Sequence, residues 1–416
     1  MKILYLLQQF PNISSEAFLL NEITELQAMG NDVWILADEI NKIDQNKLHS
    51  LIIENDLMKK VISNNTYARG LFKFVDFLKT FFIDLISSPK KTLNSLFIIL
   101  FQVPYFENKN IWSKFDNYLI IKRLLVINFD LVYAPFAHLE KIDRGLAIAK
   151  ISKAKFATAF RALELYGKSC CQDIIKYKKL FKKIDAIITI SIVNKQRLEE
   201  LLGEDTKITI VHSSIDPDKF MPVQRNDSIV NKIICIARFI EKKGIIYLLE
   251  ALHYLKNDGI KAELLLIGEG PMLTTYLDKI QELKIDELVK ISRPINQELI
   301  KSALQESDIM VLPCIVDKNG DRDIMANVLK EAMATGIPVI SSNISGIEEL
   351  ITDNDNGLLF PEKDSKALAE AIKKLIKNNE LRETLSRNGR EKIVNDFNVK
   401  KEVKKLNNIF LEITKS

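Results

Sequence analysis

The chain contains 416 residues, of which 47% are hydrophobic and 27% charged, a composition that excludes an intrinsically disordered protein and favours two domains over one compact core. The net charge of +4 is small and the basic residues are spread along the chain, which excludes an electrostatic nucleic-acid binder. No apolar run reaches the about 20 residues that a membrane-spanning helix needs, and the run after Met1 is too short for a signal peptide, so we expect a cytoplasmic protein.

Short apolar segments alternate with helical patterns along the first half, which is typical of parallel sheets covered by helices. We predict a helix over residues 18–29 that ends at Gly30, because its apolar residues lie on one face and glycine suits the cap. The predicted strands of this half cover residues 3–7, 33–37, 131–134, 156–160, 186–190 and 208–211.

The segment from 66 to 125 mixes basic residues with many Phe, Leu and Ile side chains, a composition that favours contact with an anionic membrane surface. Its basic residues include Arg69, Lys73, Lys79, Lys90, Lys91 and Lys114.

A second series of strands follows a polar, proline-containing stretch that reads as a linker. These strands are predicted over residues 233–237, 263–267, 289–292, 309–312, 338–341 and 358–360, and a last amphipathic helix over 400–413. We therefore expect an α/β protein with two Rossmann-like, doubly wound domains that face a cleft, since such sheets bind ligands at the carboxyl ends of their strands. The predicted boundaries are 1–212 for the first domain, 213–231 for the linker, 232–395 for the second domain and 396–416 for a helix that packs back toward the first.

The four cysteines indicate neither disulfides nor a metal site, because Cys170, Cys171, Cys235 and Cys314 lack metal-ligand spacing and only four histidines accompany them. Cys235 and Cys314 lie in apolar, strand-like runs, so we expect them to be buried thiols.

The most informative stretch covers residues 321–341, where a polar loop precedes a short helix that ends at Gly336. If the helix begins near Asn327, its free amides point toward the loop that carries Asp323, and a diphosphate can bind there. Glu331 lies one turn further on, where a carboxylate can accept hydrogen bonds from a ribose. An ordinary acidic helix start with a solvated glutamate has the same residues, and for an isolated acidic pair it is the commoner case.

Two further groups of residues lie where the predicted strands of the second half end. Arg238 follows one strand and Lys243 comes before the next helix, a placement that suits a pyrophosphate and equally a solvated turn. Gly268 and Gly270 follow another strand, and such a turn allows the backbone to approach a ligand closely, although many ordinary turns have this sequence.

Taken in order, these motifs resemble those of the retaining GT-B glycosyltransferases of family 4 that build bacterial surface polysaccharides, the group with colanic-acid and lipopolysaccharide-core enzymes. The matching elements are Arg238 with Lys243-Gly244, Gly268-Glu269-Gly270-Pro271, Val311-Leu312-Pro313, Asn327 to Ala334, Gly336 to Ile340, Gly346 to Glu349 and Asn356 to Phe360. In the first half, Phe10-Pro11, Ser15-Glu16-Ala17-Phe18 and Asn21-Glu22-Ile23 are similar to the opening of the same subgroup, which suggests Glu16 as a substrate-binding residue.

The resemblance implies a role for each matching residue of the second half. Arg238 and Lys243 would neutralise the donor diphosphate, together with amides near Asn327 and Val328. Glu331 would hold the ribose of the nucleotide, and Asp323 would meet the donor sugar. Asp323 departs from the family, which has glutamate there, and Ile324-Met325-Ala326 replaces a family Gly-x-Pro turn.

The first half departs further from the family pattern. Arg161 stands where the family has a histidine near the reaction centre, and arginine cannot serve as a general base because it keeps its proton. Arg161 and Glu164 are candidates for binding an acidic acceptor sugar or a phosphate, and the alternative is a surface ion pair between these two residues. The segment from His212 to Asp216 resembles a family hinge but has Ser214 in place of glycine.

The resemblance implies metal-independent transfer of a hexose, with retention, from a UDP- or GDP-sugar to a saccharide or lipid-linked acceptor, without a cofactor. In the family the leaving phosphate is thought to accept the acceptor's proton, so the missing histidine need not abolish transfer. Two alternatives remain open: a non-catalytic sugar-nucleotide-binding subunit that pairs with an active transferase, and a nucleotide-sugar 2-epimerase of the same architecture.

Overall fold

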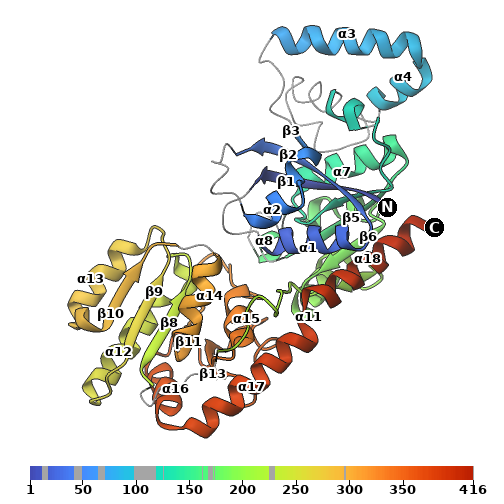
Figure 1. Cartoon of the computed structure of the whole chain (residues 1–416). Helices are drawn as coiled ribbons and strands as arrows, with labels where there is room; N and C mark the ends of the chain where they lie inside the picture. The colour runs from blue at the N-terminus through green and yellow to red at the C-terminus, as the bar shows by residue number, and fades with distance from the viewer. Residues whose placement is uncertain are drawn as a thin grey trace.

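A computed structural model describes residues 1–11, 17–41, 49–63, 71–97, 119–124, 126–161, 163–166, 172, 174–223, 230–294 and 297–415. The chain forms two α/β domains, each built around one parallel sheet, in the GT-B architecture (Figure 1). The predicted fold class is therefore confirmed.

The first domain contains a parallel sheet with strand order β3-β2-β1-β4-β5-β6-β7. The order reverses between β1 and β4, as expected of a doubly wound sheet. Its strands are β1 (Lys2–Phe10), β2 (Asp32–Ile40), β3 (Val61–Ser63), β4 (Leu131–Ala134), β5 (Lys155–Phe160), β6 (Ala186–Thr189) and β7 (Ile208–Ile210). Its helices include α1 (Ala17–Ala28), α2 (Ser50–Glu54), η2 (Leu57–Lys60), α3 (Leu71–Ser87), α4 (Pro89–Phe97), α7 (Leu139–Ser152), α8 (Leu163–Tyr166), α10 (Lys178–Phe181) and α11 (Ile192–Leu202).

The second domain repeats this plan with the strand order β10-β9-β8-β11-β12-β13. Its strands are β8 (Lys232–Ile236), β9 (Glu263–Ile267), β10 (Val289–Ser292), β11 (Ile309–Leu312), β12 (Val339–Ser342) and β13 (Leu358–Phe360). Its helices include η5 (Glu241–Lys243), α12 (Ile245–Asn257), α13 (Leu273–Leu283), η6 (Asp286–Leu288), α14 (Gln297–Gln305), α15 (Asn327–Thr335), α16 (Ser365–Lys377) and α17 (Asn379–Asp396). The last helix, α18 (Val399–Lys415), follows α17 and packs on the first domain.

Every strand predicted from the sequence is present, and the structure adds β3, whose three residues are too few to show a pattern. The first predicted helix is α1, and Gly30 after it has a φ of +84°, a left-handed conformation that favours glycine. Cys235 and Cys314 are buried free thiols, as expected. Cys170 and Cys171 lie outside the described residues, as do Arg69 and Lys114.

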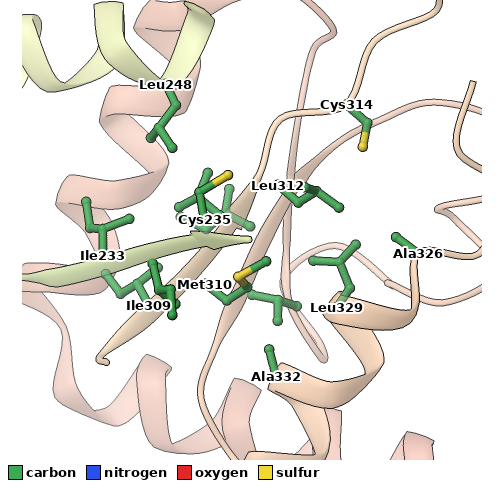
Figure 2. Close-up of a cluster of buried hydrophobic side chains, with 14 of the residues drawn as sticks. Ile233, Cys235, Leu248, Ile309, Met310, Leu312, Cys314, Ala326, Leu329 and Ala332 are labelled. Atoms are coloured by element: carbon green, nitrogen blue, oxygen red, sulfur yellow. The ribbon is translucent and has the colours of Figure 1, made fainter. Parts of the chain in front are cut away.

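The core of the second domain holds α15 against the centre of its sheet (Figure 2). Leu329 and Ala332 of α15 point toward Met310 and Leu312 of β11, and all four side chains are fully buried. Burying apolar side chains of this size stabilises the contact by about 1.5–3 kcal/mol for each large residue. The start of α15 is thereby fixed beside the carboxyl end of β11.

The chain crosses between the domains twice. The first crossing follows β7, and the second joins α17 to α18, where Ile215 forms a parallel β-bridge with Asn398. Helix α18 buries Val403, Leu406 and Phe410 in the core of the first domain, so the last helix is part of that domain's packing (Figure 1). Residues 224–229 of the predicted linker lie outside the described part of the chain.

Candidate functional site

The carboxyl edge of the second sheet brings together the residues that the sequence singled out in this half. Arg238 follows β8, Gly268 and Gly270 follow β9, and the loop from β11 to α15 carries Asp323. The strand order reverses between β8 and β11. A reversal of this kind opens a crevice at the carboxyl ends of the strands, and open α/β sheets bind their ligands there.

The N-terminus of α15 has no side-chain cap, because Ala326 occupies the N-cap position. The side chain of Asn327 is engaged elsewhere, since its Oδ1 accepts a hydrogen bond of 3.1 Å from Ser213 Oγ. The amides of Asn327 and Val328 are therefore left to point into the loop that carries Asp323. Free amides and the helix dipole together favour an anion at this position.

Asp323 and Lys243 form an ion pair beneath this edge, with both side chains largely buried. Lys242 Nζ lies 3.5 Å from Asp323 Oδ1, and Cys314 Sγ donates to Asp323 Oδ2 at 3.3 Å. Burial raises the pKa of Asp323, but Lys243 and Lys242 outweigh it and bring the pKa to about 2. Both members of the pair are thus charged at neutral pH, and Lys243 is held by a protein carboxylate.

Arg238 differs from Lys243 because its side chain is exposed, and none of the residues in the described ranges pairs with it. The two cations are nevertheless neighbours. Burial and the positive charge of Arg238 both lower the pKa of Lys243, while Asp323 and Cys314 together raise it by more. Arg238 is therefore the cation of this edge that is available to an anionic ligand.

Gly268 and Gly270 pack against the loop that carries Arg238. A Cβ atom on Gly268 would lie 1.9 Å from the carbonyl oxygen of Ala237, and one on Gly270 would lie 2.5 Å from that of Phe239. The Phe239 amide also donates to the Glu269 carbonyl at 2.7 Å. These glycines therefore allow two loops to approach each other, which fixes the position of Arg238.

Glu331 lies one turn into α15 and is half-buried. Its neighbour Lys330 is fully buried and donates a hydrogen bond to the carbonyl of Ser213 in the crossing segment. Burial lowers the pKa of Lys330 to about 7, and Glu331 only partly opposes that shift. Helix α15 thus joins the candidate donor edge to the segment between the domains.

Arg161 is held by contacts within the first domain. Its side chain is 12% exposed, lies 3.5 Å from the Glu22 carboxylate and donates from Nε to the Pro135 carbonyl at 3.1 Å. The guanidinium also sits 4.3 Å above the ring of Phe18. The alternative of a surface ion pair with Glu164 is wrong, because the partner is Glu22 and the pair is mostly buried.

Glu164 is 3% exposed and accepts a hydrogen bond of 3.3 Å from the backbone amide of Arg161. Its carboxylate therefore supports the turn after β5, a position that is closed to an acceptor sugar in this conformation. Glu16 lies outside the described residues.

Glu402 is a buried acid that the sequence did not single out. Its carboxylate accepts a hydrogen bond of 2.8 Å from the His212 amide, and the His212 ring rests on Phe397. A cavity of about 20 Å³ lies among Glu22, Arg161, His212 and Glu402, which leaves room for about one water molecule and none for a sugar. The sequence did contain a signal for it, because Glu402 is a charged residue within the apolar face of the last helix.

The two domains also touch through Glu349 and Arg322. The Glu349 carboxylate accepts hydrogen bonds from the amides of Ile192 at 2.9 Å and Val193 at 3.0 Å, so a loop of the second domain caps α11 of the first. The Arg322 guanidinium lies 5.0 Å from the ring centre of Tyr166. The candidate donor edge therefore faces the first domain.

Most of the second domain matches a known protein family. Residues 217–392 match the family of glycosyl transferases group 1. The matched segment, called the group 1 segment below, contains Arg238, Lys243, Asp323 and Glu331.

Relatives extend the similarity to nearly the whole chain. The chain is 28% identical over 417 residues to WcaL of Escherichia coli, a glycosyltransferase assigned to colanic acid biosynthesis, with 96% of each chain covered. It is 28% identical over 394 residues to the amylovoran biosynthesis glycosyltransferase AmsK of Erwinia amylovora, with 90% of each covered. A galactosyltransferase of Escherichia coli, whose donor is UDP-Gal and whose acceptor is GlcNAc-diphosphoundecaprenol, is 22% identical over 282 residues, which cover 65% of this chain and 67% of that one.

Solved structures share the two-domain arrangement. A glycosyltransferase from Rickettsia africae superposes with a TM-score of 0.71 at 19% identity, covering 100% of this chain and 99% of the other. HepE of Anabaena, in complex with UDP-glucose, superposes with a TM-score of 0.70 at 15% identity, covering 99% and 100%. At such identities the likeness concerns the fold.

Proposed function

We propose that this protein is a retaining hexosyltransferase that moves a sugar from a nucleoside diphosphate to a lipid-linked saccharide during the synthesis of a bacterial surface polysaccharide. The observation that carries the proposal is the carboxyl edge of the group 1 segment. There, an uncapped helix N-terminus, the exposed Arg238 and Glu331 occur together. These groups suit a diphosphate and a ribose, and the relatives in colanic acid and amylovoran biosynthesis support the polysaccharide pathway.

In the proposed reaction the acceptor hydroxyl oxygen bonds to the anomeric carbon of the donor sugar. The bond from that carbon to the diphosphate breaks, and the hydroxyl proton passes to an oxygen of the leaving phosphate. Arg238 and the amides of Asn327 and Val328 stabilise the charge that grows on the diphosphate. Arg161 cannot take the proton, because arginine stays charged.

We propose that these protein groups neutralise the diphosphate without a metal ion and without a cofactor. Preorganised cations and helix amides supply the electrostatic stabilisation that a divalent cation supplies in other phosphate-transfer sites. Transfer is then expected to continue at an undiminished rate in the presence of EDTA, whereas a metal-dependent enzyme would lose activity that Mg²⁺ or Mn²⁺ restores.

UDP-sugars are the favoured donors within this proposal, since HepE was solved with UDP-glucose and the galactosyltransferase relative uses UDP-Gal. GDP-sugars remain the other donor class to compare. The same relative acts on a sugar linked to a lipid diphosphate, which supports a lipid-linked acceptor at the cytoplasmic face of the membrane.

A non-catalytic sugar-nucleotide-binding subunit is the second candidate. It is favoured by the ion pair between Asp323 and Lys243. In this pair, the carboxylate expected to contact the donor sugar and the lysine expected to contact the diphosphate bind each other instead. A subunit of this kind would bind the donor and release no diphosphate, whatever acceptor is supplied.

Calorimetry with UDP-sugars and GDP-sugars tests the donor site directly. Arg238→Gln and Glu331→Gln are each expected to weaken donor binding by about ten- to a hundredfold, since each removes one charge-assisted contact worth about 1.5–3 kcal/mol. Arg387→Gln is the matched control, because Arg387 is an exposed arginine on α17 of the same domain. Equal affinities for the wild type and all three variants would exclude this edge as the donor site.

A further inference from the structure

Helices α3 and α4 form a hairpin at the end of the first domain that points away from the second domain (Figure 1). One face of this hairpin is part of the protein core. Phe77 is buried, Phe81 stacks on it with ring centres 5.7 Å apart, and Leu78 and Leu96 pack against the same cluster. The hairpin is therefore anchored to the domain through its inner face.

The opposite face is also apolar, but it is exposed. Phe82 is 56% exposed, Ile83 66%, Ile86 84% and Leu93 53%. Residues 82, 83 and 86 lie on the other side of α3 from residues 77, 78 and 81, since each residue advances the helix by about 100°. A helix that is apolar on both sides is normally buried on both, so the outer face is suited to a second apolar environment.

Among the hairpin side chains that the structure describes, the exposed charges beside this outer face are positive. Lys79 lies on α3 beside Phe82 and Ile83, and Lys90 lies at the start of α4, three residues before Leu93. Asp84, an acid of the hairpin, is partly buried and pairs with Lys122 at 2.8 Å. Among hairpin residues whose side chains are described, the exposed charged groups are therefore these two lysines.

We propose that the outer face of the α3–α4 hairpin, formed by Phe82, Ile83, Ile86 and Leu93 with Lys79 and Lys90, docks on the surface of an anionic lipid bilayer. Apolar side chains flanked by lysines are what such an interface binds, with the rings and methyl groups among the acyl chains and the ammonium groups at the head groups. No helix in the described part of the chain is long and apolar enough to cross a membrane, so the contact is one of docking on the surface.

This inference rests on the proposed function, because membrane docking serves the enzyme only if its acceptor is linked to a membrane lipid. Docking through the first domain would hold the enzyme where its acceptor is concentrated. The residues of the hairpin play no part in the candidate donor site, so membrane docking and donor binding can be tested separately.

Vesicle flotation of the full chain without donor tests the proposal. The wild type is expected to float with vesicles of phosphatidylcholine and phosphatidylglycerol. Ile86→Ser is expected to weaken this binding by about tenfold or more, because it removes an apolar side chain that would enter the bilayer. The double variant Lys79→Gln and Lys90→Gln should bind roughly twenty-fivefold more weakly, about fivefold for each lysine, and should bind these vesicles as weakly as it binds phosphatidylcholine alone.

Leu299→Ser is the matched control, because Leu299 is 52% exposed on α14 of the second domain. The proposal would be overturned if all variants floated as well as the wild type. It would also be overturned if light scattering showed a wild-type dimer that Ile86→Ser converts to a monomer, because the face would then bind a second copy of the chain. Donor calorimetry on the same variants separates the two proposals. Lost flotation with unchanged donor affinity assigns the hairpin to the membrane whether or not transfer is ever observed.

Discussion

Asp323 and Lys243 form a largely buried ion pair at the candidate donor edge. Each had been expected to contact the donor, Asp323 at the sugar and Lys243 at the diphosphate, yet the structure pairs them with each other. A diphosphate has to compete with Asp323 for Lys243. Lys242 remains close to Asp323 and pairs with Asp321 at 2.9 Å, so the carboxylate stays partly neutralised if Lys243 turns away.

Removing one member of this pair is expected to be strongly destabilising. Asp323→Asn alone should lower the free energy of unfolding by about 3 kcal/mol, because it leaves the buried charge of Lys243 without its carboxylate. Lys243→Met should cost less, because Lys242 still partly neutralises Asp323. The double variant should recover about 1–3 kcal/mol of the summed loss, as measured by urea unfolding. The solvent-screened pair of Lys373 and Asp258, 2.7 Å apart, is the control, and its two single losses are expected to add. Additive losses at Asp323 and Lys243 would show that the pair does not form.

The buried amine of Lys330 should make the stability of the protein depend on pH. Its pKa is lowered by burial to about 7 in the folded state, so between pH 7 and its ordinary value the unfolded chain binds more protons. The stability of the wild type relative to Lys330→Met should therefore rise with pH above 7, by up to about 1.4 kcal/mol per pH unit. Urea unfolding of both proteins at neutral and alkaline pH measures this difference. A difference that is constant, or that falls as pH rises, contradicts the buried amine.

At the scale of elements, the turn after β9 is predicted to require glycine at position 268, because there is no space for a Cβ atom. Gly268→Ala should destabilise the second domain by about 3 kcal/mol or more, because the new Cβ would meet the Ala237 carbonyl oxygen at 1.9 Å. Gly259→Ala is the control, since that glycine has a φ of +72° but no atom within 4 Å, and should cost only about 1 kcal/mol. Thermal unfolding of both variants measures the contrast. Equal losses would mean that backbone conformation alone requires Gly268.

Strands β8, β9 and β11 of the second domain were predictable because each is a short, mostly buried apolar run that is followed closely by a glycine, a proline or a charged residue. The polar loop before a short helix that ends at Gly336 also indicated a helix start near Asn327, where α15 begins. The partners of the charged residues were not predictable. The pairing of Arg161 with Glu22 joins β5 to α1 across many residues of chain, and periodicity within one element carries no signal for such a contact.

At the scale of the whole molecule, Glu349 is predicted to hold the two domains together. Glu349→Ala removes the acceptor for two amides at the start of α11, so the domains should separate more readily. Small-angle scattering without donor should give a larger radius of gyration for this variant than for Glu348→Ala, which changes the exposed neighbouring acid. Identical radii for the wild type and both variants would show that this contact does not set the domain arrangement.

The division into two doubly wound domains followed from the order of strands along the sequence, whereas the way the domains meet did not. That meeting depends on single polar contacts, such as Lys330 with Ser213 and Glu349 with α11, whose partners lie more than a hundred residues apart. The residues of the two crossings, Ile215 and Asn398, are similarly far apart in sequence.

Release of diphosphate from UDP- and GDP-sugars, with and without a membrane lipid extract, tests the proposed transferase most directly. The proposed transferase should release diphosphate only when the extract is present, and this release should persist in EDTA and fall in Arg238→Gln but not in Arg387→Gln. Tight binding of a donor by the wild type with no diphosphate released under any of these conditions would contradict it and would identify a sugar-nucleotide-binding subunit instead.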